Sequence, residues 1–252
     1  MLFVRGGSMV DVYGSTRVVE SFCLDITEVT VAAFELYLTD LETNPDTRPS
    51  AKQLRTDAKT ILFTNTSDDY LRELSKNCNF GKDGRTQHPI NCVTLQTAGR
   101  FCNWRKGTRL PTRWEWEWAA RGGSTEKAYP WGPEPPSEER LNACDKGSCQ
   151  QLPGYPRTPM HSGNDGYAAT APVGEFPKTD RAEKSRKPKE FKDLAGNVWE
   201  FVSCEGSGCA LKGGSFRTVD AAWILTRNTN DISGRLDARS DEAGFRCAAK
   251  PQ

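Results

Sequence analysis

The spacing of apolar residues along the chain predicts short strands at its start, followed by helices. Residues 3–9 have the composition of a strand that runs into a turn, and residues 18–24 show the alternating burial pattern of a half-buried strand. From Thr30 onward the period changes to that of one helical face, and the apolar positions on this face are Ala33, Phe34, Tyr37, Leu38 and Leu41. We therefore expect a helix that begins after Thr30, with the Thr30 hydroxyl as its cap.

Capping residues predict two further helices. The first follows Thr94, and the side chains that share one of its faces are Ala98, Phe101, Cys102 and Arg105. The second begins at Thr112, which forms a capping-box pattern with Glu115, and the pair Gly122-Gly123 predicts its end. Residues 43–77 are polar, and we expect a long loop there with a short helix near Tyr70–Leu74.

The second half of the chain predicts little regular structure. Residues 123–190 contain many Gly and Pro and no clear period, and short strands are expected around residues 198–202, 210–212 and 244–248. A long ordered loop usually needs a metal, disulfides or a binding surface. The pattern thus predicts helices in the first half of the chain and mainly loops and short strands in the second, and the length fits one large domain or two small ones.

The composition of the chain limits the kinds of molecule that we expect it to bind. The chain has 252 residues, with 34 Lys and Arg against 33 Asp and Glu, so its charge gives no reason to expect nucleic acid or an acidic membrane surface. The basic run Lys184–Lys189 is interpreted as a solvated loop. No apolar stretch is long enough for a membrane span, and no signal-peptide pattern opens the chain. We expect that a targeting segment has been removed.

Nine cysteines are too many for routine buried thiols in a chain of this length. Two close pairs, Cys144/Cys149 and Cys204/Cys209, lie in predicted loops. Zinc is the main alternative to disulfides, but His88 and His161 are the only histidines and neither has a second His at ligand spacing. The pattern favours disulfides and an oxidising compartment, so that the protein would be secreted, periplasmic or on the cell surface, with at least one thiol left over.

Several motifs, taken in order, resemble the formylglycine-generating (sulfatase-modifying) enzyme family. The most diagnostic is Arg109–Gly123, with the sequence RLPTRWEWEWAARGG. The others are Phe22–Thr30, His88–Val93, Tyr129–Gly132, Asn164–Val173, Asp193–Glu200, Lys212–Phe216 and Gly244–Cys247. The resemblance covers nearly the whole chain except residues 40–77, and it implies a single domain over residues 1–252 with a C-type-lectin-like α+β fold, rich in loops and poor in regular structure.

Compared with the family that it resembles, the chain lacks the residues that hold the redox metal. The family's name-giving members oxidise a cysteine of sulfatases to formylglycine, using O2 and copper held by two cysteines that follow the Gly-Gly-Ser turn. Here those positions are Thr218 and Trp223, and no cysteine lies between Cys209 and Cys247. Cu(I) prefers soft thiolates, and another branch of the family holds iron with three histidines. Neither copper nor iron is therefore expected.

Calcium is the cofactor that the resemblance implies. One ion would be bound by Asp193, Gly196, Val198 and Glu200, and a second by Asn142, Ala143, Asp165 and Tyr167. Carboxylate and carbonyl oxygens are the ligands that Ca²⁺ prefers. For the first set the alternative is structural, with Asp193 capping a turn and Glu200 paired to an arginine.

The resemblance further implies a disulfide between Cys102 and Cys247. Besides the two close pairs, Cys78–Cys92 is a further expected bridge, which leaves Cys23 unpaired. Four tryptophans in the motifs are interpreted as core residues rather than a carbohydrate-stacking surface: Trp114, Trp118, Trp131 and Trp199. Four arginines are expected to pair with acids such as Asp237, Asp241 and Glu242 rather than to bind an anion: Arg227, Arg235, Arg239 and Arg246.

The missing thiol pair favours a non-catalytic module that binds a ligand or serves a structural role. We expect its contacts with a protein, peptide or small-molecule ligand in the segment from Phe216 to Asp241, which is dense in polar groups and aromatic anchors. The candidate residues are Phe216, Arg217, Thr218, Asp220, Trp223, Arg227, Asn230 and Arg239. One alternative for this segment is a solvated loop held by Arg–Asp pairs. For the whole protein the alternatives are an oxidoreductase of the formylglycine-generating type with a rearranged site, or an accessory enzyme of a biosynthetic cluster.

Overall fold

The computed structural model describes residues 1–43, 50–59, 72–73, 75–147, 149–151, 158–178, 190–206, 208–231 and 237–251. Three sequence-based expectations lie wholly or largely outside these ranges: the helix near Tyr70–Leu74, the basic run Lys184–Lys189, and Arg235. No helix of the described ranges combines the length and apolar character that a membrane crossing requires.

Three helices begin where the capping residues predict. Thr30 Oγ1 accepts a hydrogen bond from the N–H of Ala33 at 3.0 Å, and Thr94 Oγ1 accepts one from Thr97 at 3.1 Å. The third helix carries the complete capping box of Thr112 and Glu115. These helices are α1 (Val31–Thr43), α4 (Leu95–Trp104) and α5 (Arg113–Ala120).

Helix α2 (Ala51–Asp57) lies in the segment that the sequence predicts to be a loop, so that prediction is wrong for these residues. The Ser50 hydroxyl caps the helix by accepting from the Gln53 N–H at 3.3 Å. Leu54 and Ala58 are buried in the same apolar cluster as the core face of α1. A few apolar side chains packed on a neighbouring helix are enough to hold this short helix, because tertiary packing outweighs weak local preference.

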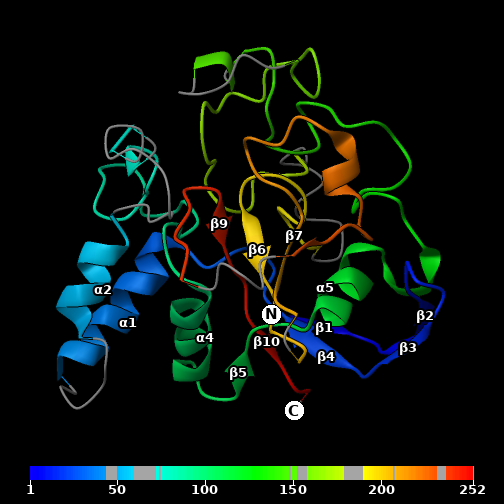
Figure 1. The fold of residues 1–252 in the computed structure, drawn as a ribbon, viewed down its shortest axis with the longest axis horizontal. Helices are drawn as coiled ribbons and strands as arrows, with labels where there is room; N and C mark the ends of the chain where they lie inside the picture. The colour runs from blue at the N-terminus through cyan, green and yellow to red at the C-terminus, as the bar shows by residue number, and fades with distance from the viewer. Residues whose placement is uncertain are drawn as a thin grey trace.

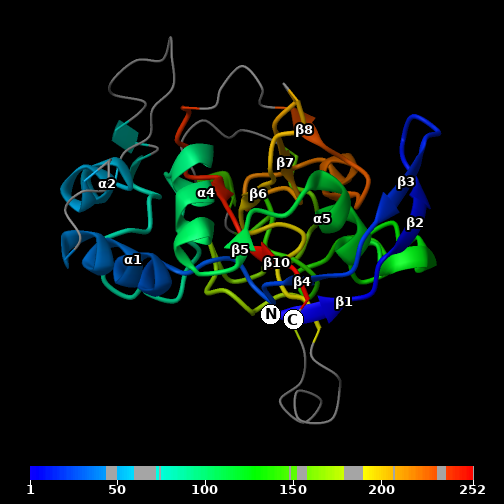
Figure 2. The same cartoon turned by 90° about the horizontal axis from the view of Figure 1, so that it is seen from below.

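The two strands predicted near the start of the chain are each divided between two sheets. Both expected strands are interrupted, because residues 5–6 and 20–21 pass from one sheet to the other. One half of each forms a projecting hairpin, and the other half joins a four-stranded sheet (Figure 2). The hairpin contains β2 (Gly7–Val10) and β3 (Thr16–Val19). The four-stranded sheet has the order β1 (Leu2–Val4), β4 (Phe22–Leu24), β10 (Ala248–Ala249) and β5 (Thr108–Arg109).

A second four-stranded sheet carries the segment expected to contain the functional site. Its order is β8 (Asn230–Asp231), β7 (Ala210–Lys212), β6 (Trp199–Phe201) and β9 (Ala243–Gly244). Strand β9 pairs parallel to β6, whereas the other neighbours are antiparallel. The expected strand at residues 244–248 is thus two strands, β9 and β10, and each belongs to a different sheet.

The main core lies between the helices and these sheets. Helices α1, α2 and α4 lie on one side of the β6–β9 sheet, and α5 with the β2–β3 hairpin lies on the other (Figure 1). Phe101 of α4 packs between Phe34 and Phe245, with ring centroids 6.0 and 5.4 Å away. From residue 121 to 178 the described chain has only short 3₁₀ turns, η1 (Gly123–Thr125) and η2 (Cys149–Gln151).

Candidate functional site

The segment between β7 and β9 begins with a tight turn that requires glycine. Gly213 and Gly214 have φ of 95° and 80°, in the left-handed region. A Cβ on Gly214 would lie 2.6 Å from the side chain of Ile224, so no other residue fits. The turn places Ser215 beside Glu242, and Ser215 Oγ donates a hydrogen bond to Glu242 Oε2 at 2.6 Å. Residues near both ends of the segment are thereby joined.

Thr218 is the first of the two positions at which the family resemblance implies a metal-binding cysteine. Its Oγ1 accepts a hydrogen bond from the Ser215 N–H at 2.9 Å, and its carbonyl accepts from Cys144 at 3.2 Å. The residue is buried. Its side chain therefore closes the turn.

Trp223 occupies the second such position, on the 3₁₀ turn η3 (Ala221–Ile224). Asp220 caps this turn by accepting from the Ala222 N–H at 2.8 Å. The Trp223 ring meets Trp199 edge to face, with centroids 6.1 Å apart, yet 42% of the residue is exposed. Trp223 is therefore an exposed aromatic side chain whose position is fixed by its contact with Trp199 and by the capped turn.

All nine cysteines are accounted for. Four disulfides join Cys78–Cys92, Cys102–Cys247, Cys144–Cys149 and Cys204–Cys209. The unpaired cysteine is Cys23 in β4, as the sequence led us to expect. In the β1–β4–β10–β5 sheet its neighbours across the strands are Phe3 and Ala249, so it has no second thiol to act with.

The residues predicted to contact a ligand divide into a buried and an exposed group. Phe216 is buried, and Arg217 forms a buried ion pair with Asp241 at 2.6 Å. Arg239 pairs with Asp57 of α2. The three exposed members are Asp220, Trp223 and Arg227, while Asn230 pairs with Leu211 in the sheet.

Of the four arginines expected to pair with acids, the three that the structure describes do so, but with other acids than those named from the sequence. Arg246 binds Glu200 through Nη2 at 2.6 Å, and Arg227 lies 3.6 Å from Glu126. Both partners come from distant parts of the chain, where sequence spacing gives no signal. The tryptophans of the motifs are mainly interior: Trp118 and Trp199 are buried, while Trp114 and Trp131 are partly buried.

A buried ionic cluster supports the exposed segment, and sequence reasoning did not find it. Lys212, at the end of β7, is fully buried and lies 3.5 Å from Glu117 of α5. Its Nζ also donates to Thr229 Oγ1 at 3.1 Å. Burial lowers the pKa of Lys212 to about 8, although Glu117 acts in the opposite direction. The only signal in the sequence is a lysine that directly follows buried Ala-Leu in a short strand.

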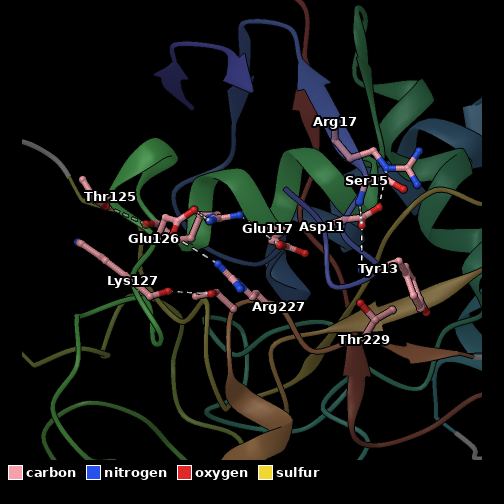
Figure 3. A network of polar contacts seen from close by, with 12 residues as sticks. Asp11, Tyr13, Ser15, Arg17, Glu117, Thr125, Glu126, Lys127, Arg227 and Thr229 are labelled. Atoms are coloured by element: carbon pink, nitrogen blue, oxygen red, sulfur yellow. Dashed lines mark hydrogen bonds and ion pairs between the residues drawn. The ribbon is translucent and has the colours of Figure 1, made fainter. Parts of the chain in front are cut away.

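The same cluster extends to the surface through Arg121 and Glu126. Arg121 is buried and donates to Glu126 Oε1 at 2.7 Å, and Glu126 in turn faces Arg227 (Figure 3). Thr226 donates to the Lys127 carbonyl at 2.8 Å. Residues 226–229 are therefore fastened to α5 and the turn after it, which holds the polypeptide beyond Trp223 in place.

Both carboxylates of the first expected calcium set already have partners within the protein. Both oxygens of Glu200 are held by Arg246, and Oε2 also accepts from Trp116 Nε1 at 2.7 Å. The Asp193 carboxylate accepts from the N–H groups of Gly174 and Phe176. A cation here would have to compete with a fully buried guanidinium. These contacts are the structural alternative that the sequence left open.

The second expected set fits a cation better. Asn142 is fully buried, and its Oδ1 has no hydrogen-bond partner among the described residues. Asp165 is also buried, and burial together with Asp145 raises its pKa to about 7. In the described ranges no group of three or more His, Cys, Asp or Glu side chains could hold a metal. A cation here would therefore have to be bound in part by the side-chain amide of Asn142 and by backbone carbonyls such as those of Ala143 and Tyr167.

Comparisons with known proteins agree with the sequence motifs. The profile of the sulfatase-modifying factor enzyme 1-like domain matches residues 1–251. The chain is 31% identical over 190 residues to the formylglycine-generating enzyme of Thermomonospora curvata, covering 66% of this chain and 57% of that protein. It is 33% identical over 174 residues to the inactive C-alpha-formylglycine-generating enzyme 2 of Mus musculus, covering 64% and 49%. The chain thus spans about half the length of these relatives.

The fold is also similar to a solved structure, that of PvdO from Pseudomonas aeruginosa. The TM-score is 0.61 at 19% identity, and the match covers 99% of this chain and 94% of that one. This likeness concerns the fold alone. It confirms the predicted mixed α and β architecture with little regular structure.

Proposed function

Because the chain belongs to the sulfatase-modifying factor, or formylglycine-generating enzyme, family, we propose that it serves as a non-catalytic ligand-binding or structural module on that scaffold. The observation that carries the proposal is how the cysteines of this chain are used. Eight of nine cysteines form disulfides, and Thr218 and Trp223 stand where the resembling enzymes have thiols. A copper site built on two soft thiolates has no ligands in such a protein.

The ligand surface that we propose is centred on Trp223. The ring is exposed, and its position is fixed by Trp199 beneath it and by the Asp220 cap. Rigid exposed aromatics contribute strongly to binding because little conformational entropy is lost when they are covered. Asp220 and Arg227 add one charge of each sign to the exposed part of the segment. The buried Phe216 and Arg217 support this surface.

A calcium ion at Asn142 and Asp165 is part of the proposal. The buried, unpartnered Asn142 Oδ1 supports it, since an orphaned carbonyl oxygen in the interior is costly unless it finds a partner. The Asp165 carboxylate and the carbonyls of Ala143 and Tyr167 would complete the protein ligands. When bound, the ion would supply a cross-link between two loops that have little regular structure.

We also propose that the protein works in an oxidising compartment, secreted, periplasmic or at the cell surface. Four disulfides support this, because such bridges persist where thiols are not kept reduced. The proposed partner is a protein, a peptide or a small molecule.

Loss of catalysis is tested by incubating the protein with Cu(I), O2 and a peptide of the form Cys-x-Pro-x-Arg, followed by mass spectrometry. We expect the peptide thiol to remain, at the level of a sample without protein. Conversion of the cysteine to formylglycine above that level would instead establish the alternative, an oxidoreductase of the family type with a rearranged site.

Binding is tested on peptide and glycan arrays with the wild type, Trp223→Ala and Leu36→Ala. Leu36 is exposed on α1, away from the proposed surface, and so controls for the loss of an exposed apolar side chain. We expect Trp223→Ala to weaken a captured ligand by about fivefold or more, while Leu36→Ala leaves it unchanged. A ligand that binds both variants like the wild type would place the site elsewhere.

A further inference from the structure

A pocket of about 550 Å³ lies away from the segment of Trp223, and none of the described residues of that segment lines it. It is bordered by β1, by the C-terminal end of α5 with the turn after it, and by residues 190–195. This volume is in the range of pockets that hold small organic molecules. From its walls we infer that it binds a small organic anion with an aromatic or similarly flat apolar body, independently of the function proposed above.

The apolar part of the pocket is aromatic and held rigidly. Its lining includes Trp118, Trp131, Phe176 and Phe191. Trp131 stacks on Tyr129, with centroids 5.2 Å apart and the ring planes at 12°. Ordered rings of this kind provide flat apolar area without a large entropy loss on binding.

Both indole N–H groups are already used by the protein. Trp118 Nε1 donates to the Arg5 carbonyl at 2.8 Å, and Trp131 Nε1 donates to the Glu134 carbonyl at 2.9 Å. The two rings therefore offer ligands apolar surface and no hydrogen bonds. A sugar, which presents many hydroxyl groups, would leave most of them unpaired against these walls. A flat apolar ring has no hydrogen-bonding groups that the same contact would leave unpaired.

The charged part of the pocket is mainly cationic. Arg5, Lys127 and Arg140 line it, and none of them has a carboxylate partner among the residues that the structure describes. Lys127 and Arg140 donate to neutral oxygens, at 3.4 Å to Pro130 and at 2.9 Å to Ser137. These contacts leave their positive charge uncompensated.

Two carboxylates line the pocket among the residues that the structure describes. Asp193 is buried and its oxygens accept from Gly174 and Phe176, so its charge is engaged by backbone N–H groups. Glu190 is exposed at the rim. Three uncompensated cations against one exposed acid favour an anion over a neutral or cationic ligand of the same shape.

The test compares 2-naphthoate with 2-naphthylmethanol, which has the same ring system without the charge. Isothermal titration calorimetry at low salt should show 2-naphthoate binding more tightly, with an affinity that falls as salt is added. Lys127→Met should weaken 2-naphthoate by about two- to fivefold, the range of an exposed charge contact, and leave the alcohol unchanged. Lys106→Met removes an exposed lysine outside the pocket and should change nothing. Glu190→Gln should tighten 2-naphthoate.

The aromatic walls are tested by Trp131→Ala, which should weaken both probes by about tenfold. Because Trp131 also packs on a small apolar cluster, Phe191→Leu is the second variant if the first does not fold. Trp223→Ala should leave both probes unaffected, which separates this pocket from the surface proposed above. The inference is overturned if neither probe binds, if the alcohol binds as tightly as 2-naphthoate, or if Lys106→Met weakens binding as much as Lys127→Met.

Discussion

Arg217 and Asp241 form an ion pair inside the protein, with 2.6 Å between Nη2 and Oδ2 and no more than 2% of either side chain exposed. Arg217 lies two residues after Ser215 of the Gly-Gly-Ser turn, and Asp241 directly precedes Glu242, which accepts from Ser215. The pair therefore fixes both ends of the segment that carries Trp223. Arg217 was expected from sequence to contact a ligand, but its place is beneath the surface.

Arg217→Ala should destabilise the fold. Removing one partner of a buried pair leaves the other charge without compensation, which typically costs about 3–5 kcal/mol. Urea unfolding measures the change. Arg227→Ala is the matched control, because its pair with Glu126 is 3.6 Å long and solvent-exposed, and it should cost less than about 1 kcal/mol. Equal losses in the two variants would contradict the difference in burial.

Lys212 should make the protein more stable as the pH rises above about 8. Its folded pKa of about 8 lies below the ordinary value of 10.5, so between these values the unfolded chain binds more protons and stability increases with pH. The gain should reach roughly 2–3 kcal/mol by about pH 10. Lys212→Met should lack it. Urea unfolding of both proteins at pH 7.5 and 9.5 is the measurement, and parallel changes in the two would exclude Lys212 as the source.

Calcium should raise the melting temperature, and a chelator should lower it. An ion bound only by the folded protein stabilises it by about 2.7 kcal/mol at a hundredfold excess over its Kd. Asp165→Asn should abolish the response. Asp193→Asn should retain it, because Asp193 belongs to the first set, in which the buried Arg246 guanidinium already occupies both oxygens of Glu200. An identical melting curve with and without chelator, in metal-free protein, would rule the ion out.

The bridge between Cys102 and Cys247 should contribute most to stability. It spans 145 residues, against 5 for Cys204–Cys209. The chain-entropy relation assigns about 5 kcal/mol to the long loop and about 2 kcal/mol to the short one. Unfolding of the double variants Cys102→Ala/Cys247→Ala and Cys204→Ala/Cys209→Ala compares them. The order would be wrong if the short bridge cost more to remove.

Sequence motifs predicted those helices and strands whose formation depends on residues close to one another in the chain. Thr112 and Glu115 are three positions apart, and their mutual hydrogen bonds start α5 where the capping-box pattern places it. Helix α2 was missed because its stability comes from Leu54 packing in the cluster around α1 rather than from its own pattern. The strands near residues 3–9 and 18–24 were found, but their division between two sheets is a property of tertiary pairing.

The sequence indicated a segment for the candidate site, but not which of its side chains are exposed. The family motifs located the segment after Gly213-Gly214 and the two positions that lack thiols. Whether a polar residue in that segment faces solvent depends on partners that are distant in the chain, as Arg239 shows by reaching Asp57. The proposed calcium residues and ligand contacts stay predictions, since the experiments above are what test them.

The position of β10 bears on how the protein is made in the cell. This strand lies between β4 and β5, although both of those strands are synthesised well before it. The first sheet therefore cannot close on the ribosome until translation has passed Ala249. Until then β4 and β5 expose the edges that β10 will pair, and unpaired edges on a nascent chain are sites where aggregation begins. Chaperones that shield such edges during translation should increase the yield of folded protein.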